Sequence, residues 1–399
     1  MISYQEAYAQ VLAHPLAMGE ECVSLLDSVG RMLAEDVFAD RDFPPFNRAT
    51  KDGIALNFES YAAGQRTFAI QGVAPAGMPQ QTLVQDQHCI EVMTGAVVPL
   101  GTDTVVMYEH LEIKEGVATI VQEVKKGQNI HYKGSDELAG TKLLSTGTPI
   151  SAVEIGILAS VGKAKVQVFA LPRVCAVATG DELVDIDEVP LPHQIRRSNS
   201  ITLQAALSAY GIRAKAMHLL DDKKSIAQGL ERALAENDVL LLSGGVSKGK
   251  YDYIPEVMEQ LGVEKIFHRV AQRPGKPFWF GVHKATDTII FSFPGNPVST
   301  FANFHLYFKP WLHTSWKLPV PEKTIKLKGT LEILPPLTRF MQVTEEWSGG
   351  TLYAKLVMEN GSGDLTSLAK ADGFIRLEPR DFPYEYGEEV PYVPTRIRK

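Results

Sequence analysis

The sequence predicts a multi-domain protein that combines an α/β domain with two β-rich modules. Its 399 residues exceed what one hydrophobic core usually supports, so several cores are expected. Between 171 and 316, apolar runs alternate with helical patterns, which is typical of a doubly wound α/β domain. Short alternating strands between Gly and Pro turns predict a β-rich module at 42–136 and a small β-barrel or sandwich at 317–399.

The segments 1–41 and 137–170 are expected to form a mainly helical first domain. A serine followed three residues later by a glutamate, a capping-box pattern, begins predicted helices at Ser3 and at Ser151. A further helical piece is expected over 24–34. Because predicted helices lie on both sides of the β-rich module, we expect the module to be inserted into this domain, with a tandem arrangement as the alternative.

In the α/β region three predicted strands run directly into turns of small residues. These turns are TGDEL at 179–183, SGGVSKGKYD at 243–252 and FPGNP at 293–297. In a parallel sheet the ligand collects where such strands end, and small residues let backbone amides approach an anion. Each turn taken alone is also consistent with a plain tight turn, but together they favour a phosphate-bearing ligand.

Charged residues of both signs follow the same strands. Glu182, Asp221 and Asp252 place carboxylates after three different strands, which is an arrangement able to bind Mg²⁺ together with substrate phosphates. Arg269 and the RPGKP turn at 273–277 add cations that suit a ligand with several negative charges. The alternatives are helix N-caps for the aspartates and a solvated loop for the cations.

The bulk properties exclude several classes of protein. A net charge of −7 without a long Lys/Arg block argues against a nucleic-acid partner. No stretch approaches the length of apolar sequence that a membrane span needs, and no signal peptide is recognisable. Cys22, Cys89 and Cys175 are far apart without a CxxC pair, so we expect buried free thiols, a reducing compartment and a cytoplasmic location.

Three further short motifs lie in the β-rich module: KDG at 51–53, MTGA at 93–96 and KGSD at 133–136. Each could be only a turn. Taken in order with TGDEL, SGGVSKGKYD, RPGKP and FPGNP, however, they resemble the MoeA family, to which the gephyrin E domain is related. The resemblance spans nearly the whole chain, and the joint order of the motifs is far more specific than any one of them.

The resemblance implies an activity in molybdenum cofactor biosynthesis. The implied reaction inserts molybdate into adenylylated molybdopterin with release of AMP, assisted by Mg²⁺ or a similar divalent ion. It also implies an elongated homodimer, with molybdopterin adenylyltransferase as an upstream partner. Its four domains would be domain I at 1–41 and 137–170, domain II at 42–136, a molybdopterin-binding domain III at 171–316 and domain IV at 317–399.

The family's functional residues are carried over position by position. The resemblance implies catalytic roles for Asp52, Thr94, Asp136 and Glu182, and Asp52 is the acid expected to assist cleavage of the adenylate. It implies metal binding by Glu182, Asp221 and Asp252. It implies substrate binding by Asp221, Gly244, Gly245, Ser247, Asp252, Arg269, Arg273, Lys276, Pro294 and Pro297.

The chain departs from the family pattern at several positions. Arg269 and Arg273 stand where lysine is frequent, Lys133 where arginine is frequent, and Arg197 where an acid is common. Two other functions stay open at this stage. One is a nucleotide pyrophosphatase like the CinA family, against which the front β module and the C-terminal region argue. The other is a non-catalytic scaffold like gephyrin, which the retained acids disfavour.

Overall fold

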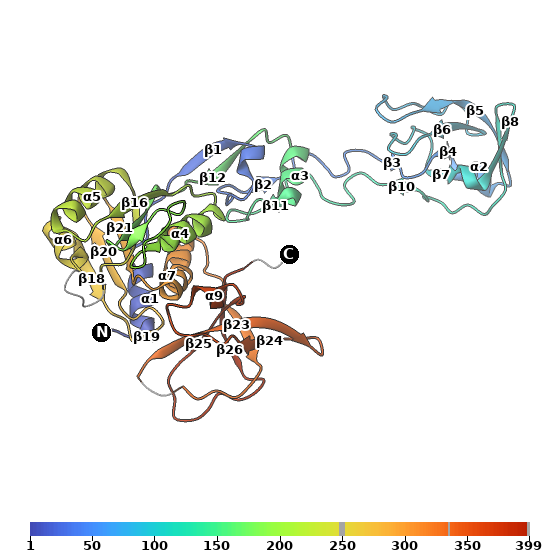
Figure 1. The fold of residues 1–399 in the computed structure, drawn as a ribbon. Coiled ribbons are helices and arrows are strands. Elements are labelled where there is room, and N and C mark those ends of the chain that lie inside the picture. Colours follow the sequence, from blue (N-terminus) through green and yellow to red (C-terminus); the bar gives the residue numbers. More distant parts are fainter. Residues whose placement is uncertain (247–251, 334–335, 397–399) are drawn as a thin grey trace. The chain divides into compact units, whose positions relative to one another are not determined.

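The computed structural model of the chain describes residues 1–246, 252–333 and 336–396. They form two compact units (Figure 1). The α/β unit comprises Met1–Cys22, Gly30–Met32 and Gln167–Lys399, and the β unit comprises Val23–Val29 and Leu33–Val166. Among the described residues, no helix is long and apolar enough to cross a membrane.

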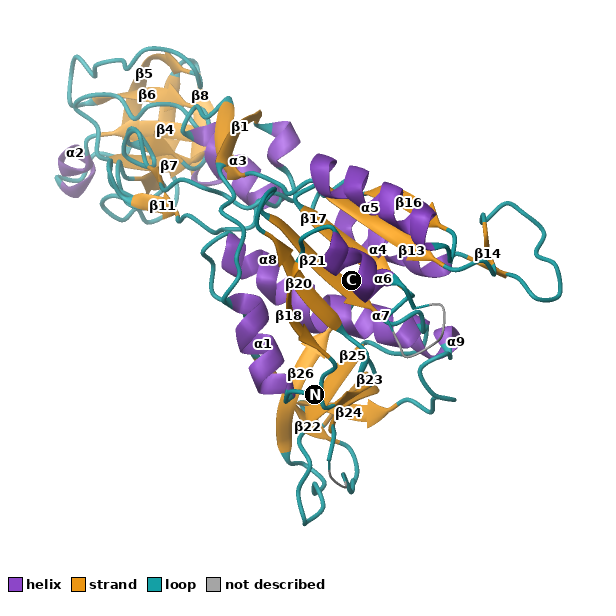
Figure 2. Cartoon of the chain, turned by 90° about the vertical axis from the view of Figure 1, so that its left-hand side faces the viewer, coloured by secondary structure: helices purple, strands orange, loops and turns teal. Residues whose placement is uncertain are grey.

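The α/β unit contains a six-stranded sheet of mixed direction. Its strands, in spatial order, are β16 (Lys215–Leu219), β13 (Val174–Thr179), β17 (Val239–Ser243), β21 (Thr288–Phe293), β20 (Trp279–His283) and β18 (Glu264–His268). The first four strands are parallel, and the remaining two pairings, β21 with β20 and β20 with β18, are antiparallel. Helices pack on the sheet in Figure 2. The predicted doubly wound domain is therefore confirmed.

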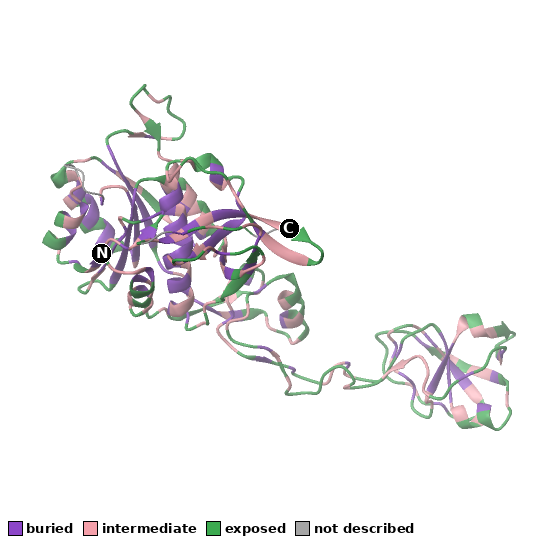
Figure 3. Ribbon diagram, turned by 90° about the horizontal axis from the view of Figure 1, so that it is seen from below, coloured by how far each residue is buried: buried purple, intermediate pink, exposed green. Residues whose placement is uncertain are grey.

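The central strands are buried along their whole length, which explains their continuous apolar runs. Every residue of β13, β17 and β21 is buried (Figure 3). The covering helices are α4 (Ser198–Ser208), α5 (Lys223–Glu236), α6 (Ile254–Gln260) and α7 (Pro297–Asn303). Asp222 caps α5 by accepting hydrogen bonds from the backbone N–H groups of Lys224 and Ser225. Side chains of α5, such as Leu230, fill the core on the inner face.

The helix that begins at Pro297 continues far beyond α7. A π-helical turn (Phe304–Phe308) and α8 (Lys309–Ser315) follow it directly, so the predicted long helix is confirmed. The N-terminal helix α1 (Tyr4–Leu12) packs against this element, because the Tyr4 and Tyr307 rings are 5.8 Å apart. The capping box predicted at Ser3 is present.

The C-terminal region of the α/β unit is a closed five-stranded barrel, so the barrel is confirmed rather than the sandwich. Its strands are β22 (Lys323–Leu327), β23 (Thr338–Ser348), β24 (Thr351–Leu356), β25 (Gly373–Leu377) and β26 (Glu389–Pro394), with α9 (Leu365–Leu368) between β24 and β25. Pairing of β23 with β25 closes the ring. The short strand β19 (Gln272–Arg273), which precedes β20, pairs with β23 and so adds to the barrel's edge.

The β unit is built on a second six-stranded sheet in the order β7, β4, β6, β5, β9, β8. The strands are β4 (Gly53–Leu56), β5 (Thr67–Ala74), β6 (His88–Val92), β7 (Thr104–Met107), β8 (Leu111–Lys114) and β9 (Val117–Ile120), with the short helix α2 (Phe58–Ala62) after β4. Strand β4 lies between β7 and β6, and Gly53 lies directly against β7. A Cβ at Gly53 would sit 1.9 Å from the Val106 carbonyl oxygen, so only glycine fits the last position of the KDG motif.

The front segments are less helical than predicted. Besides α1 and α3 (Ala152–Ser160), whose capping box at Ser151 is present, they contain two strand pairs, β1 (Glu20–Ser24) with β12 (Lys165–Phe169) and β2 (Val37–Phe38) with β11 (Lys142–Leu144). The helix predicted over 24–34 is wrong. The chain makes a single 3₁₀ turn (Leu26–Ser28) and then bends at Gly30, whose φ of 80° a helix cannot accommodate. Cys89 and Cys175 are buried as predicted, whereas Cys22 is exposed.

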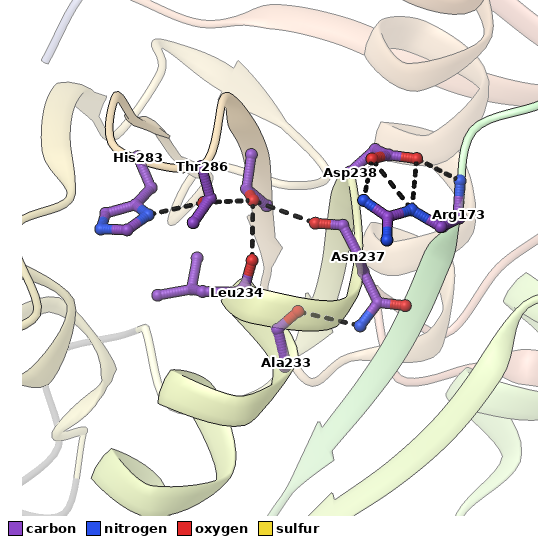
Figure 4. Close-up of polar contacts among 8 residues, drawn as sticks. Arg173, Ala233, Leu234, Asn237, Asp238, His283 and Thr286 are labelled. Atoms are coloured by element: carbon purple, nitrogen blue, oxygen red, sulfur yellow. Dashed lines mark hydrogen bonds and ion pairs between the residues drawn. The ribbon is translucent and has the colours of Figure 1, made fainter.

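At the amino end of the parallel sheet, hydrogen bonds link the residues at which neighbouring strands begin (Figure 4). Arg173, directly before β13, donates from Nη2 to Asp238 Oδ1 at 2.6 Å, and its backbone N–H donates to Asp238 Oδ2 at 2.7 Å. Asp238 directly precedes β17. At the start of β21, the Thr288 hydroxyl lies 3.2 Å from the Leu234 carbonyl oxygen and 3.0 Å from that of Asn237. Three adjacent strands are thereby joined at their first residues.

Candidate active site

The opposite, carboxyl end of the sheet opens into a cavity of about 710 Å³. It is lined by the turns that follow β13, β17 and β21, together with the turn after β19. The cavity brings together many of the predicted binding and metal residues, namely Glu182, Asp221, Gly244, Gly245, Asp252, Arg273, Lys276, Pro294 and Pro297. Ser247 lies outside the described residues. The sequence pattern therefore located this site through the position of turns at strand ends.

The glycines of two turns let the backbone approach closely. Gly244 has a φ of 102°, and a Cβ there would lie 2.7 Å from Thr179 Oγ1 and 2.8 Å from the Thr179 carbonyl oxygen. A Cβ on Gly295 would lie 3.6 Å from Gly244 Cα, which places the SGG and FPGNP turns side by side. The hydroxyl of Thr179, which is 5% exposed and lines the cavity, has no hydrogen-bond partner among the described residues. These turns can accept an anion against backbone and hydroxyl groups.

One part of the cavity is acidic. Burial raises the pKa of Asp221, and the negative charges of Asp181, Glu182 and Asp252 raise it further. The Asp221 backbone N–H donates to Asp181 Oδ1 at 2.9 Å, which fixes the turn after β16 beside the turn after β13. Carboxylates that disfavour each other's ionisation gain from a bound cation, because the cation compensates their charge.

The carboxylates do not form a complete metal cage. Within residues 1–246, 252–333 and 336–396, no three His, Cys, Asp or Glu side chains are arranged to hold a metal ion. This arrangement nevertheless fits Mg²⁺, because Mg²⁺ is usually bound by one or two carboxylates plus substrate phosphates and water.

The other part of the cavity is basic and rigidly supported. Arg273 is the last residue of β19, and Lys276 belongs to the turn that follows it. Behind it the fully buried Gln272 donates from Nε2 to the Pro274 carbonyl at 3.0 Å and to Asn303 Oδ1 at 2.9 Å. Arg269, in contrast, is not among the cavity residues, and its backbone N–H donates to the Phe278 carbonyl at 2.8 Å.

Several cavity residues escaped the sequence reasoning. Arg196, Arg197 and Asn199 come from the start of α4 and the short strand β15 (Ile195–Arg196) that pairs with β14 (Leu183–Val184). Asn199 Nδ2 donates to the Gly295 carbonyl at 2.7 Å. Leu337, Ser362 and Gly363 come from the barrel region. The pairing of β19 with β23 is a long-range contact without a short sequence motif, so nothing in the sequence signalled the barrel's contribution.

Two histidines contact backbone carbonyls of the turns at the cavity. Nε2 of His218 lies 2.8 Å from the Gly180 carbonyl oxygen, and Nε2 of His268 lies 2.9 Å from that of Val246. Since carbonyls only accept, both Nε2 atoms carry the proton. Burial, helped by the nearby positive charge of Arg269, lowers the pKa of His268, so it is neutral at pH 7. Both histidines therefore hold backbone carbonyls of the turns that line the cavity.

The β unit brings Asp52 and Thr94 together. The Thr94 backbone N–H and hydroxyl donate to Asp52 Oδ1 at 2.6 and 2.7 Å. These two hydrogen bonds lower the pKa of Asp52, which is therefore ionised at neutral pH. Tyr108 lies nearby, donating from its hydroxyl to Glu91. Burial raises the Tyr108 pKa, as do Glu91 and the charge of Asp52. The MTGA and KDG motifs thus build one carboxylate site.

Asp136, the remaining predicted catalytic acid, lies at the end of the KGSD turn. Its Oδ1 atom is 2.7 Å from His131 Nε2. The side chain is 54% exposed, so a ligand can reach it. Glu182 belongs to the cavity of the α/β unit, whereas Asp52, Thr94 and Asp136 belong to the β unit.

Three protein-family models match the chain in sequence order. Residues 2–162 match the MoeA N-terminal region, which comprises domains I and II. Residues 175–314 match a probable molybdopterin binding domain, and residues 325–395 match the MoeA C-terminal region, which is domain IV. These matches define the chain as a MoeA-type protein along nearly its full length.

Whole-chain relatives agree. A Synechocystis protein named molybdopterin molybdenumtransferase is 37% identical over 98% of this chain and 99% of its own, and a Staphylococcus epidermidis protein of the same name is 33% identical over 99% and 96%. A crystal structure of a MoeA protein from Pyrococcus horikoshii superposes with a TM-score of 0.82 at 28% identity, covering all of both chains. The chain belongs to the MoeA family of molybdenum cofactor biosynthesis.

Proposed function

We propose that this chain is a molybdopterin molybdenumtransferase that inserts molybdate into adenylylated molybdopterin and releases AMP. The cavity that joins backbone turns, cations and carboxylates at the carboxyl end of the sheet carries the proposal, because its groups match a phosphate-bearing ligand. The full-length relatives named molybdopterin molybdenumtransferase support transfer of molybdenum to molybdopterin. The adenylylated form of the substrate and the release of AMP are what the family resemblance implies. Matches on both sides of the α/β domain leave the CinA-like alternative without support.

Within this proposal the cavity residues have separate roles. Arg273 and Lys276 would neutralise the substrate's phosphate groups, and the amides of the SGG turn would hold the pterin phosphate. Molybdate is a dianion, so it also needs cations and hydrogen-bond donors. Ser247 and Arg269 remain proposed binding residues by resemblance.

One or two of the carboxylates of Glu182, Asp221 and Asp252 would hold Mg²⁺ together with substrate oxygens and water. The ion would supply charge neutralisation at the phosphoanhydride. The raised pKa of Asp221 supports this assignment, since its neighbouring negative charges would be compensated by a cation. Removal of divalent ions with a chelator is expected to weaken substrate binding.

Asp52 is the group proposed to assist cleavage of the adenylate. Thr94 keeps it ionised, so its carboxylate can accept a hydrogen bond from the attacking oxygen and then its proton. Asp136 would be a second carboxylate in contact with substrate. We also propose a cytoplasmic homodimer, which sedimentation analysis at working concentration would test.

The decisive experiment measures AMP release from adenylylated molybdopterin in the presence of molybdate. Asp52→Asn keeps the side-chain shape but removes the charge, and it should slow AMP release by about 100-fold or more. Asp86→Asn, a change at an exposed acid of the same unit, serves as the matched control and should leave the rate unchanged. A normal rate for Asp52→Asn refutes its role, and an inactive wild-type protein favours the scaffold alternative.

A further inference from the structure

Three polar side chains of the β unit, Arg48, His131 and Asp136, are linked by hydrogen bonds at a short two-stranded ribbon. Strand β3 (Arg48–Ala49) pairs antiparallel with β10 (Ile130–His131) (Figure 1). The register of this pairing places Arg48 directly opposite His131. Nη2 and Nε of Arg48 lie 3.0 and 3.3 Å from His131 Nδ1. On its far side the imidazole reaches Asp136, with Nε2 2.7 Å from Oδ1.

These distances determine which imidazole nitrogen carries the proton. A guanidinium group has only donors, so Nδ1 of His131 must be the acceptor of the Arg48 hydrogen bonds. The proton of the neutral ring therefore resides on Nε2, and Nε2–H donates to the Asp136 carboxylate. Because its Nδ1 lone pair is occupied, His131 is not available as a proton acceptor for a substrate.

The backbone around Asp136 is fixed to the same segment that carries Arg48. The Asp136 backbone N–H donates to the Phe43 carbonyl at 2.9 Å, and that of Gly134 donates to the Pro44 carbonyl at 3.0 Å. Asn47 Oδ1 accepts from the Lys133 backbone N–H at 2.8 Å. Main chain and side chains thus converge on one orientation of the acid.

We infer that Arg48 and His131 are positioning residues that hold the Asp136 carboxylate in one orientation for the reaction. Arg48 fixes the imidazole tautomer, and the imidazole fixes the carboxylate through Oδ1. The hydrogen bonds to Asp136 side-chain oxygens within the described residues, from His131 and from Ser135 at 3.4 Å, all go to Oδ1. Oδ2 is then the atom presented to the ligand. The functional part of this inference rests on the proposed function.

A substitution series separates positioning from a general structural effect. His131→Gln retains a side-chain N–H that can donate to Asp136, whereas His131→Leu retains only bulk. His131→Leu should lower kcat about tenfold, which corresponds to an increase of about 1.4 kcal/mol in the activation free energy of the reaction. KM should change less. His131→Gln should recover most of the loss. His88→Leu, at a histidine elsewhere in the unit, is the control and should retain the wild-type rate.

A double-mutant cycle shows whether His131 acts through Asp136. In an Asp136→Ala background, His131→Leu should cause no further loss of kcat, because the group it positions is gone. Full additivity of the two losses overturns the inference, and so does a wild-type rate for His131→Leu when Asp136→Ala is slow.

A second measurement does not depend on activity. Nitrogen-15 NMR of histidine-labelled protein at pH 8 should show His131 protonated on Nε2 alone. Arg48→Met combined with Asp136→Ala should restore the tautomer mixture of a free imidazole, because the Asp136 carboxylate by itself still holds the proton on Nε2. A proton on Nδ1 in the wild-type protein overturns the inference whatever the kinetics. If the tautomer is as expected but Asp136→Ala has a normal rate, the catalytic assignment of Asp136 fails and the functional half of the inference is refuted with it.

Discussion

The two ends of the parallel sheet in the α/β unit differ in the charges that surround their aspartates and in how tightly they are packed. At the amino end, Asp238 is paired with Arg173, and three strands start within a closed set of hydrogen bonds (Figure 4). At the carboxyl end, Asp221 faces other carboxylates, and glycine turns surround a cavity. Burial tends to raise the pKa of both aspartates, but Arg173 reverses the effect at Asp238, whose pKa is lowered. Among the described residues, an aspartate thus lies beside a cation at the amino end of the sheet and beside other carboxylates at the carboxyl end.

The largest effect on stability is expected at the glycine turns of the carboxyl end. Gly244→Ala should lower the free energy of unfolding by about 3 kcal/mol, because its φ is unfavourable and its Cβ would meet Thr179. Gly262→Ala is the matched control, since Gly262 has a φ of 82° and its Cβ would meet only His283 Nε2 at 4.0 Å. It should cost about 1 kcal/mol. Equal losses in urea unfolding would show that crowding at Gly244 is unimportant.

The amino end is tested by breaking its charged pair. Asp238→Asn should cost about 1 to 2 kcal/mol, because Arg173 loses a charged acceptor in a partly exposed site. The lowered pKa of Asp238 contributes stability above the ordinary aspartate pKa, and this contribution disappears as the pH falls through the folded-state pKa. The difference in stability between wild type and variant should therefore shrink on acidification. Retention of AMP release in the variant would show that this end is structural, and its loss would contradict the separation of roles.

The smallest stability effect, with the opposite sign, is expected at Asp221. Its raised pKa means that the wild-type protein loses stability as the pH rises through that pKa. Asp221→Asn removes the repulsion and should raise the free energy of unfolding by up to about 0.5 kcal/mol at pH 8 in metal-free buffer. Thermal unfolding with and without Mg²⁺ checks this, because added Mg²⁺ should stabilise the wild type more than the variant. Destabilisation by Asp221→Asn without metal would show that Asp221 is already compensated.

The sequence was informative where local rules decide the structure. The apolar runs of β13, β17 and β21 predicted fully buried strands, and the glycines after them located the cavity. The predicted helix at 24–34 was wrong because strand pairing before it and a bend at Gly30 override helical propensity.

The parts of the site that the sequence did not predict depend on contacts between distant segments. Ser362 enters the cavity because its hydroxyl accepts from Asn296 Nδ2 at 2.8 Å, across 66 positions in the sequence. His218 and His268 act on carbonyls, which any residue can offer, so no motif marks them. The Arg48 and His131 pair is likewise visible only once β3 and β10 are in register.

Strand β19 has a practical consequence for any attempt to divide this chain. Its two residues pair with β23 at the barrel's edge, and Arg273, together with Lys276 from the turn that follows, also lines the cavity. A fragment truncated before the barrel would deprive Gln272 and Arg273 of their ladder partners in β23 and would remove Leu337 and Ser362 from the cavity wall. Ligand-binding measurements on such a fragment would consequently report on a different pocket from that of the intact chain.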